Sequence, residues 1–480
     1  MKKLILAAMM FLGVSVFAAE RPNLVVILCD DLGYGDISGF AFDTPTVETP
    51  RLTRMADEGV KLTRYLTPMS YCAPSRASLL TGRYPFHHGI VSNPTPDQGI
   101  NDYGLSPAEV TLAEVLKPAG YDTYCVGKWH LGHKQQFLPV RQGFDQYYGI
   151  LYSSDMRPVQ IIENETVAEY PVDQSLLTSK YTAKSIEYMR RSVESDHPFL
   201  LYLAHAMPHK PLAASKHFYT PETPDDLYAD VIHELDWSIG EILDEIKQLG
   251  LEENTLVIFT SDNGAWYGGS NGGLRGMKAN SWDGGYRVPF IARWPGKIAA
   301  DQINNSLCST IDLFPTLAKL AGVGVDASVD GKDIWPLMTD STASSPHRFL
   351  VEMRRDLATS VHSDKWKLVV VPPRAYSAPT KKQLDKKDRR GPDGTTILAP
   401  EQPYWVGDHP GLTTGDAPQP MMLFDIETDP GEQHNIAGMH PEVVQGLKAY
   451  YDSIKVPVLE RPKGGEFKKV EGGRLDFWNE

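Results

Sequence analysis

Short and almost unbroken apolar runs recur through the first 300 residues of the chain. They lie at 23–29, 121–126, 199–204, 256–260 and 288–292. Runs of this length without polar alternation are typical of strands that are buried on both faces of a parallel sheet. The stretches between them have helical spacing and capping residues, which predicts helices at 50–58, about 106–117, 174–193 and 225–249. Strands that alternate with helices predict an α/β fold, in which helices sandwich a large, mostly parallel sheet.

The pattern changes after about residue 345. Residues 366–371 and 422–426 are expected to form strands of a smaller antiparallel sheet, and 441–454 a helix. The stretch between these strands, 372–420, is rich in Pro, Gly, Lys and Asp, and loops of this length are usually functional or disordered. We therefore expect a main domain over 19–345, which contains the candidate functional residues described below, and a smaller C-terminal α+β domain over 346–480.

The first 18 residues have a different character from the rest of the chain. Lys2 and Lys3 are followed by an apolar run that ends in small residues, the pattern of a cleaved secretory signal peptide. No later apolar run is long enough to span a membrane. The sequence therefore predicts a periplasmic or secreted protein without a membrane anchor.

Composition narrows the possible partners of this 480-residue chain. Its 61 acidic and 47 basic residues give a formal net charge of −14. This charge argues against nucleic acid or an anionic membrane as a partner. Two of the four cysteines, Cys29 and Cys125, lie inside predicted strands. We expect no disulfide framework, because a chain of this length does not need one.

Polar side chains follow four of the predicted strands, at the edge where open α/β sheets bind ligands. They are Asp30 and Asp31, Lys128 and His130, His209, and Asp262 and Asn263. The oxygen donors among them suit a hard cation, Ca²⁺ or Mg²⁺, better than Zn²⁺. An Asp-Asp pair alone is more often a cap or a turn. A second acidic site after another strand favours a metal site.

Residues 70–83 contain a candidate nucleophile. Pro74 predicts that Cys72 enters a helix, where free N–H groups bind anions and make a thiol more acidic. Arg76 lies one turn further on and can reach back toward Cys72. A lone cysteine before a helix is more often an inert core side chain.

The segment Cys-Ala-Pro-Ser-Arg at 72–76, followed by Ala-Ser-Leu-Leu-Thr-Gly-Arg at 77–83, resembles the signature of the type I sulfatases. Further segments match this family: Gly-Lys-Trp-His-Leu-Gly at 127–132, Pro-His-Lys-Pro at 208–211, Lys278, and 423–432 as a C-terminal signature. The resemblance covers 23 to about 295 and this last segment. It implies an alkaline phosphatase-like fold with a small antiparallel C-terminal domain.

The resemblance also implies a nucleophile and a metal site. In that family the cysteine, here Cys72, is converted by a formylglycine-generating enzyme into formylglycine, whose hydrate attacks sulfur. Residue 72 and the oxygen donors at the strand ends would hold Ca²⁺, or Mg²⁺. These donors are Asp30, Asp31, Asp262 and Asn263.

The remaining matched residues imply roles in charge neutralisation and in proton transfer. Lys128 and Lys278 would neutralise the sulfuryl oxygens, while Arg76 supports the ionised nucleophile. His209 would protonate the leaving alcohol, and His130 would take the proton that releases sulfate. His205 is a weaker candidate, because a histidine at this position is about as often a hydrogen-bonded side chain of the core. Arg83 could pair with the end of the helix, and in the family it also lies near the nucleophile.

A sulfated carbohydrate is the expected substrate, either a glycosaminoglycan or an algal galactan such as carrageenan. Candidate substrate-binding residues are Arg157, Arg354, Arg355, His362, Tyr376 and Trp405, each of which could equally be an ordinary surface residue. Two alternatives remain open. One is a phosphonate or phosphodiester hydrolase of the same superfamily, and the other is a non-catalytic relative that binds sulfated glycans.

Overall fold

The computed structural model describes residues 21–40, 47–96, 103–220, 227–266, 268–377, 380–384, 409 and 411–456. The expected signal peptide and the candidate Trp405 lie outside these residues. In the described part of the chain, no helix combines the length and the apolar character needed to cross a bilayer. All four cysteines of the sequence are described, and each is buried and free.

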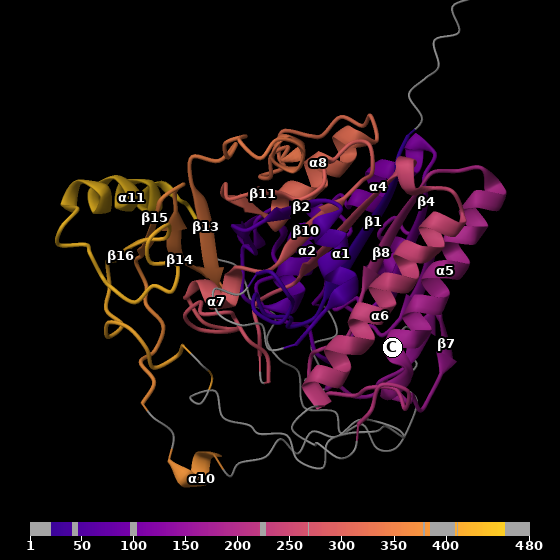
Figure 1. Cartoon of the computed structure of the whole chain (residues 1–480), viewed down its shortest axis with the longest axis horizontal. Coiled ribbons are helices and arrows are strands. Elements are labelled where there is room, and N and C mark those ends of the chain that lie inside the picture. The colour runs from indigo at the N-terminus through magenta and orange to yellow at the C-terminus, as the bar shows by residue number, and fades with distance from the viewer. Residues whose placement is uncertain are drawn as a thin grey trace, which may run out of the picture.

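A ten-stranded sheet forms the centre of the molecule, in the order β11-β2-β10-β9-β1-β8-β4-β5-β6-β7 (Figure 1). Its strands are β1 (Asn23–Cys29), β2 (Val60–Leu62), β4 (Asp122–Gly127), β5 (Gln146–Gly149), β6 (Ile161–Glu163), β7 (Thr166–Glu169), β8 (Phe199–Ala204), β9 (Thr255–Ser261), β10 (Phe290–Arg293) and β11 (Gln302–Asn304). The central strands β9, β1, β8 and β4 pair in parallel, whereas β10 is antiparallel to both of its neighbours. Every residue of β1, β8 and β9 is buried, as the apolar runs predict.

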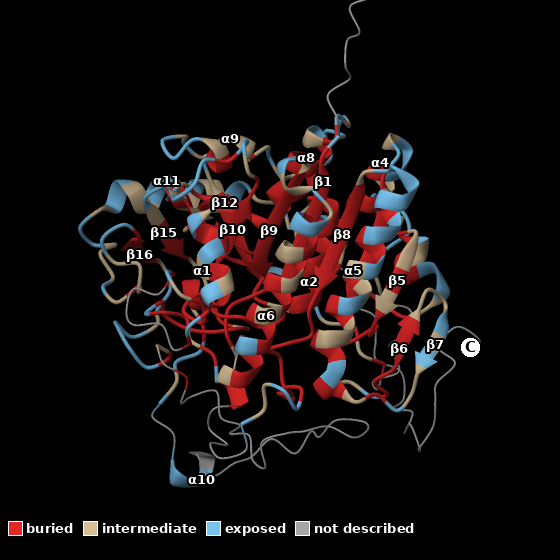
Figure 2. Cartoon of the chain, turned by 45° about the vertical axis from the view of Figure 1, so that its right-hand side comes forward, coloured by how far each residue is buried: buried red, intermediate tan, exposed pale blue. Residues whose placement is uncertain are grey.

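Helices cover both faces of this sheet, and the outer sides of α1, α5 and α6 are exposed (Figure 2). The helices are α1 (Pro50–Asp57), α2 (Cys72–Thr81), α3 (Pro85–His88), α4 (Leu112–Leu116), α5 (Leu177–Ser195), α6 (Leu227–Gln248), α7 (Asp283–Tyr286), α8 (Leu313–Leu320) and α9 (Trp335–Thr339). Leu24, Val26 and Leu28 of β1 pack in one core with α2, α4 and α8. The alternate residues Val25 and Ile27 pack in a second core with α1, α5 and α6. The sheet is therefore sandwiched between two apolar layers.

The helix expected from about residue 106 begins later. Helix α4 begins at Leu112 and continues as a 3-10 turn, Lys117–Ala119, that ends at Gly120. The side chain of Thr111 accepts from the backbone of Glu114, whose carboxylate accepts from Thr111 N at 2.7 Å. This capping box defines the start of the helix more strongly than the earlier Ser-Pro pair.

A four-stranded antiparallel sheet follows, in the order β13-β14-β15-β16. Its strands are β13 (Leu350–Arg354), β14 (Leu357–His362), β15 (Trp366–Val369) and β16 (Met422–Asp425), and α10 (Lys381–Leu384) lies between the last two in sequence. Helix α11 (Pro441–Ser453) packs on this sheet through Leu447. A two-stranded sheet pairs β3 (Tyr65–Leu66) with β12 (Cys308–Ser309). The sequence predicts β15, β16 and α11 but misses the β13–β14 hairpin.

Candidate active site

The polar residues predicted from the strand ends meet at the carboxyl edge of the large sheet. Cys29 of β1 pairs with Ser261 of β9, and Gly127 of β4 pairs with Ala204 of β8, so these strands end side by side. We call the resulting group the Cys72 centre. It consists of Asp30, Asp31, Cys72, Arg76, Lys128, His130, Ser153, His209, Asp262, Asn263 and Lys278, all of them buried.

Helix α2 carries Cys72 as its first residue. All ten residues of this helix are buried, and it ends at Gly82, whose N–H donates to Ser78 O. The backbone N–H of Ala73 donates to Asn93 Oδ1 at 3.1 Å. The core therefore fixes the helix on all sides and holds residue 72 in one place.

The thiol of Cys72 lies among charged groups. Its Sγ is 3.3 Å from Asp30 Oδ1 and 3.1 Å from Lys278 Nζ. Burial, together with the charges of Asp262 and Asp30, raises the pKa of the Cys72 thiol well above its ordinary value. The expectation of a more acidic thiol is therefore wrong, because loss of solvation and nearby carboxylates outweigh the helix N-terminus.

Arg76 reaches back to the acidic groups, as predicted. Its Nε and Nη2 donate to Asp262 Oδ2 at 2.9 and 2.8 Å, and Nη2 lies 3.7 Å from Asp30 Oδ1. Burial and Asp30 raise the pKa of Asp262 to about 7, although Arg76 and Lys128 act against this rise. Burial alone would also raise the pKa of Asp30, but Lys128, His209 and Arg76 hold it well below its usual value. The surrounding cations therefore hold Asp30 in its ionised form more strongly than Asp262.

Two lysines bring positive charge to the carboxylates of Asp30 and Asp31. Lys128 Nζ is 2.5 Å from Asp30 Oδ2, and Lys278 Nζ is 2.5 Å from Asp31 Oδ1. The segment with Lys128 is not extended. Gly127 has φ +107° and His130 has φ +63°, so the chain turns sharply on both sides of Trp129.

Ser153, which lies in the loop after β5, was not predicted from the sequence as a site residue. His130 N donates to Leu151 O at 3.0 Å, which brings the following residues beside Lys128. Ser153 Oγ lies 3.2 Å from Lys128 Nζ and 3.2 Å from His209 Nδ1. A lone serine in a loop carries no sequence signal beyond its place after a strand.

The two histidines of the centre differ in their hydrogen bonds. Nδ1 of His209 lies 2.5 Å from Lys210 O, which requires a proton on Nδ1, and Nε2 lies 3.6 Å from Asp31 Oδ2. Nε2 of His130 lies 3.2 Å from Pro94 O, and its Nδ1 has no hydrogen-bond partner among the described residues. Burial is the main cause that lowers the pKa of both histidines; for His130, Lys128 adds to it. Nδ1 of His130 is thus free to accept a proton.

Two further candidate site residues, His205 and Arg83, have partners outside the Cys72 centre. His205 is fully buried and lies 3.3 Å from Ser238 Oγ through Nε2, as a core histidine would. Arg83 donates to both carboxylate oxygens of Glu109, at 2.7 and 2.8 Å. Neither contact involves the Cys72 centre.

The candidate substrate-binding residues lie on separate loops and strands. His362 is 1% exposed on β14 and pairs with Glu352, so the expectation that it lines a substrate cleft is wrong. Arg354 and Arg355 stand at the tip of the β13–β14 hairpin, the first partly buried and the second exposed. Arg157 is exposed in the loop before β6, and Tyr376 is partly buried after β15. For these four the substrate role stays a prediction.

The acidic residues of the centre fit a divalent cation. Oxygen atoms of Asp30, Asp31 and Asp262 and the sulfur of Cys72 lie within 4.8 Å of one another. Asp31 Oδ2 and Asn263 Oδ1 are buried and make no hydrogen bond within the part of the chain that the structure describes. Hard oxygen donors of this number are typical of Ca²⁺ or Mg²⁺ sites.

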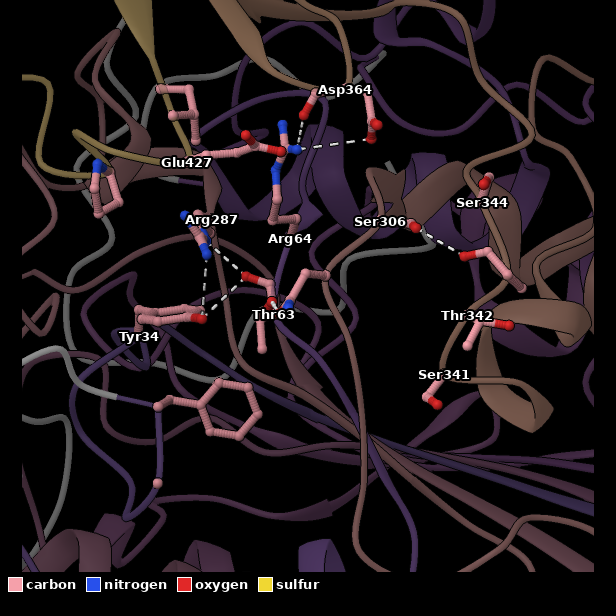
Figure 3. A pocket seen from close by; sticks show the side chains of 16 residues that line it. Tyr34, Thr63, Arg64, Arg287, Ser306, Ser341, Thr342, Ser344, Asp364 and Glu427 are labelled. Atoms are coloured by element: carbon pink, nitrogen blue, oxygen red, sulfur yellow. Dashed lines mark hydrogen bonds and ion pairs between the residues drawn. The ribbon is translucent and has the colours of Figure 1, made fainter.

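A separate pocket of about 680 Å³ lies at the seam between the two sheets (Figure 3). Its lining includes Tyr34, Arg64 and Arg287 from the large domain and Asp364 and Glu427 from the small sheet. The two arginines donate to backbone carbonyls, Arg64 Nη2 to Ser363 O at 3.1 Å and Arg287 Nε to Thr63 O at 2.6 Å. No residue of the Cys72 centre lines this pocket. Arg64 therefore helps to hold the seam together, whereas the hydrogen bond of Arg287 to Thr63 stays within the large domain.

The model of the Sulfatase family matches residues 22–323, a range that contains the whole Cys72 centre. The chain belongs to the sulfatase family. N-acetylgalactosamine-6-sulfatase of Rattus norvegicus is 37% identical over 369 residues, with 70% of each chain covered. Steryl-sulfatase of Homo sapiens is 33% identical over 425 residues, which cover 69% of this chain and 72% of the relative. This sulfatase is therefore a sulfuric ester hydrolase.

Solved structures share the fold of this sulfatase. A sulfatase from Pseudoalteromonas sp. superposes with a TM-score of 0.74 at 25% identity, with 92% of each chain covered. Ps i-CgsB in complex with k-i-k-neocarrahexaose has a TM-score of 0.72 at 24% identity, with 92% of this chain and 94% of that chain covered. The expected alkaline phosphatase-like architecture, with a large mostly parallel sheet and a small antiparallel one, is confirmed.

Proposed function

We propose that this sulfatase hydrolyses sulfate esters of a sulfated carbohydrate, with formylglycine derived from Cys72 as the nucleophile and a divalent cation beside it. One observation carries the proposal. Lys278 Nζ, Asp30 Oδ1 and the sulfur of Cys72 meet within hydrogen-bonding distance in a buried site. A neutral thiol in such surroundings is a poor nucleophile, whereas a hydrated aldehyde at the same position offers oxygen to an anionic ester.

The cation would be held by Asp30, Asp31, Asp262 and Asn263 together with residue 72, and Ca²⁺ is our first choice over Mg²⁺. A bound divalent cation stabilises negative charge on the oxygen atoms close to it. Arg76 keeps Asp262 in place through two hydrogen bonds. Lys278 places its ammonium group 3.1 Å from the sulfur of Cys72, and Lys128 places its own beside Asp30 and Ser153. Both would neutralise the sulfuryl oxygens of the substrate.

Two histidines are suited to the proton transfers. His209 presents Nε2 toward Asp31, and a proton on this atom could be donated to the leaving alcohol. His130 has a lowered pKa and a buried Nδ1 without a hydrogen-bond partner among the described residues, which suits a base that accepts a proton during sulfate release. Ser153 Oγ lies between Lys128 and His209 and would hold both side chains in place.

The substrate class is supported by the names of similar proteins. Several relatives that are 37–38% identical are N-acetylgalactosamine-6-sulfatases, and one similar structure was solved with a neocarrahexaose. The steryl-sulfatases among the relatives make a sterol sulfate the competing substrate. We favour a glycosaminoglycan or an algal galactan. Arg157, Arg354 and Arg355 are the residues we propose for contact with the sugar.

Two further parts of the proposal follow from the sequence. Conversion of Cys72 requires a formylglycine-generating enzyme as a partner. The pattern of residues 1–18 supports export to the periplasm or beyond, where sulfated polysaccharides would be met. The expected boundary between the catalytic and C-terminal domains, near residue 345, is likewise our proposal.

A substrate panel tests this function. The protein, shown by mass spectrometry to be converted at residue 72, is given chondroitin 6-sulfate and carrageenan oligosaccharides, a sterol sulfate and an aryl phosphodiester. Released sulfate and phenol are measured. We expect the highest kcat/KM with one of the sulfated oligosaccharides. Faster cleavage of the phosphodiester would favour a phosphonate or phosphodiester hydrolase, and faster release from the sterol would contradict the carbohydrate assignment.

A further inference from the structure

A second cluster of charged side chains is buried between α7 and the small sheet. We call it the Lys367 cluster, and it consists of Asp283, Glu352, His362, Lys367 and Glu432. Each of these side chains is at most 1% exposed. Figure 1 shows α7, which begins at Asp283, between the two sheets. No substrate can reach groups that are buried to this extent.

The ammonium group of Lys367 occupies the middle of the cluster. Its Nζ lies 2.5 Å from Asp283 Oδ1, 3.0 Å from Glu432 Oε1 and 3.2 Å from Glu352 Oε2. His362 Nε2 lies 2.9 Å from Glu352 Oε1. Three carboxylates and an imidazole could hold a metal ion, but here the ammonium takes the position of the cation.

The cluster sets three carboxyl groups against one ammonium group and one imidazole. Burial and Asp283 raise the pKa of Glu432, whereas Lys367 lowers it. Burial alone would lower the pKa of His362, but Glu352 and Asp283 raise it above its ordinary value. Removing one partner from a buried group of this kind leaves an uncompensated charge, which is strongly destabilising. The cluster is therefore a rigid joint between the small sheet and α7.

Glu432 connects this joint to the loop that carries Lys278. Gly284 N donates to Arg275 O at 2.7 Å and closes the base of a loop over 275–284. Glu432 Oε2 accepts from Asp283 N at 2.5 Å on one side of the base. Glu432 O accepts from Arg275 Nη1 at 2.9 Å on the other side. One residue of the C-terminal part thus holds both ends of the loop.

The tip of the same loop lies against the nucleophile segment. Lys278 N donates to Ala265 O and Ala279 N donates to Ser70 O, both at 3.0 Å. Lys278 Nζ is then 3.1 Å from Cys72 Sγ. A small shift at the base of the loop would move this ammonium away from residue 72, and misplacement by about 1 Å can lower a rate about 100-fold.

We propose that Glu432 is a positioning residue for Lys278, because it fixes the base of the 275–284 loop through Asp283 and Arg275 while Lys367 holds Glu432 in place. The proposal rests on the proposed role of Lys278 in neutralising the sulfuryl group. It gives the C-terminal segment Asp-Pro-Gly-Glu at 429–432 a function in catalysis, although it lies outside the active site.

A double-mutant cycle tests this link. Glu432→Ala, Lys278→Met and the double variant are prepared with residue 72 converted, and kcat and KM are measured with 4-nitrophenyl sulfate. We expect Glu432→Ala to lower kcat by about 10- to 100-fold. In the Lys278→Met background the same change should have almost no further effect, because both substitutions remove one function. Glu432→Gln, which keeps an acceptor for Asp283 N, should retain most of the activity.

The matched control is Ser360→Ala, which removes the hydrogen bond between Ser360 Oγ and Glu352 in the same cluster but touches no residue of the loop. It should lower the melting temperature and leave kcat within about twofold. If Glu432→Ala does not fold, Arg275→Met removes the contact with Glu432 O and should show the same non-additivity with Lys278→Met. If the losses of kcat in the two single variants multiply in the double variant, the positioning role of Glu432 is overturned, while the proposed role of Lys278 stands. An unchanged kcat in Lys278→Met would contradict the proposed role of Lys278 and the positioning role with it.

Discussion

The surroundings of single residues decide the chemistry of this site more than their identities do. Cys72 lies at a helix N-terminus, which favours a thiolate, yet burial and two carboxylates raise the pKa of its thiol. Asp30 and Asp262 lie in the same site, but the pKa of Asp30 is lowered and that of Asp262 is raised to about 7. The sequence motifs identify these groups, whereas their protonation depends on neighbours from other strands.

His209 should matter most for substrates with poor leaving groups. Burial outweighs Asp31 and lowers the pKa of His209 below its ordinary value of 6.5. A general acid loses its proton as the pH rises through its pKa, so kcat/KM for a sugar sulfate should fall with rising pH on the acid side of neutrality. His209→Asn should lower this kcat/KM by about 100-fold or more, and much less for 4-nitrophenyl sulfate, whose phenolate leaves unprotonated.

The measurement is the pH profile of kcat/KM for both substrates in the original protein and the variant. The descending limb should disappear in the variant with the sugar sulfate. Equal losses with both substrates would show that His209 does not protonate the leaving group.

At the scale of elements, strands with unbroken apolar runs were predictable, and strands with buried polar residues were not. Strands β1, β8 and β9 are apolar over most of their length because they are buried on both faces. In β14, polar Ser360 and His362 are buried beside Glu352, so the strand lacks a simple apolar pattern. Such strands depend on contacts with segments far away in the sequence.

Helix α2 should depend on the absence of a side chain at Gly82. Gly82 has φ +67°, and an added Cβ would lie 2.8 Å from Val329 Cγ1 and 2.9 Å from Phe314 Cβ. Gly322 shares a positive φ of +75° but has no atom within 4 Å of an added Cβ. Gly82→Ala should therefore lower the free energy of unfolding by about 1–3 kcal/mol more than Gly322→Ala. Urea denaturation followed by circular dichroism measures both, and equal losses would show that the contacts around Gly82 carry no cost.

At the scale of the whole molecule, the fold was predictable and the joint between its parts was not. Acidic and basic groups after strand ends predicted the Cys72 centre, since parallel strands end at one edge. Lys278 was found only through the family resemblance, because it does not directly follow a strand. It lies in a loop that reaches the centre some way after the end of β9. Ser153 and the Lys367 cluster carry no local pattern, and only the tertiary structure brings their members together.

The conversion of residue 72 is the most direct test of the account. Protein produced with and without a formylglycine-generating enzyme is compared with Cys72→Ala, using peptide mass spectrometry at residue 72 and sulfate release from 4-nitrophenyl sulfate. We predict that sulfate release is proportional to the converted fraction and is absent from unconverted protein and from Cys72→Ala. All three forms should unfold at similar temperatures, because the helix and its neighbours stay in place. Sulfate release by unconverted protein or by Cys72→Ala, at the rate of the converted form, would contradict formylglycine as the nucleophile.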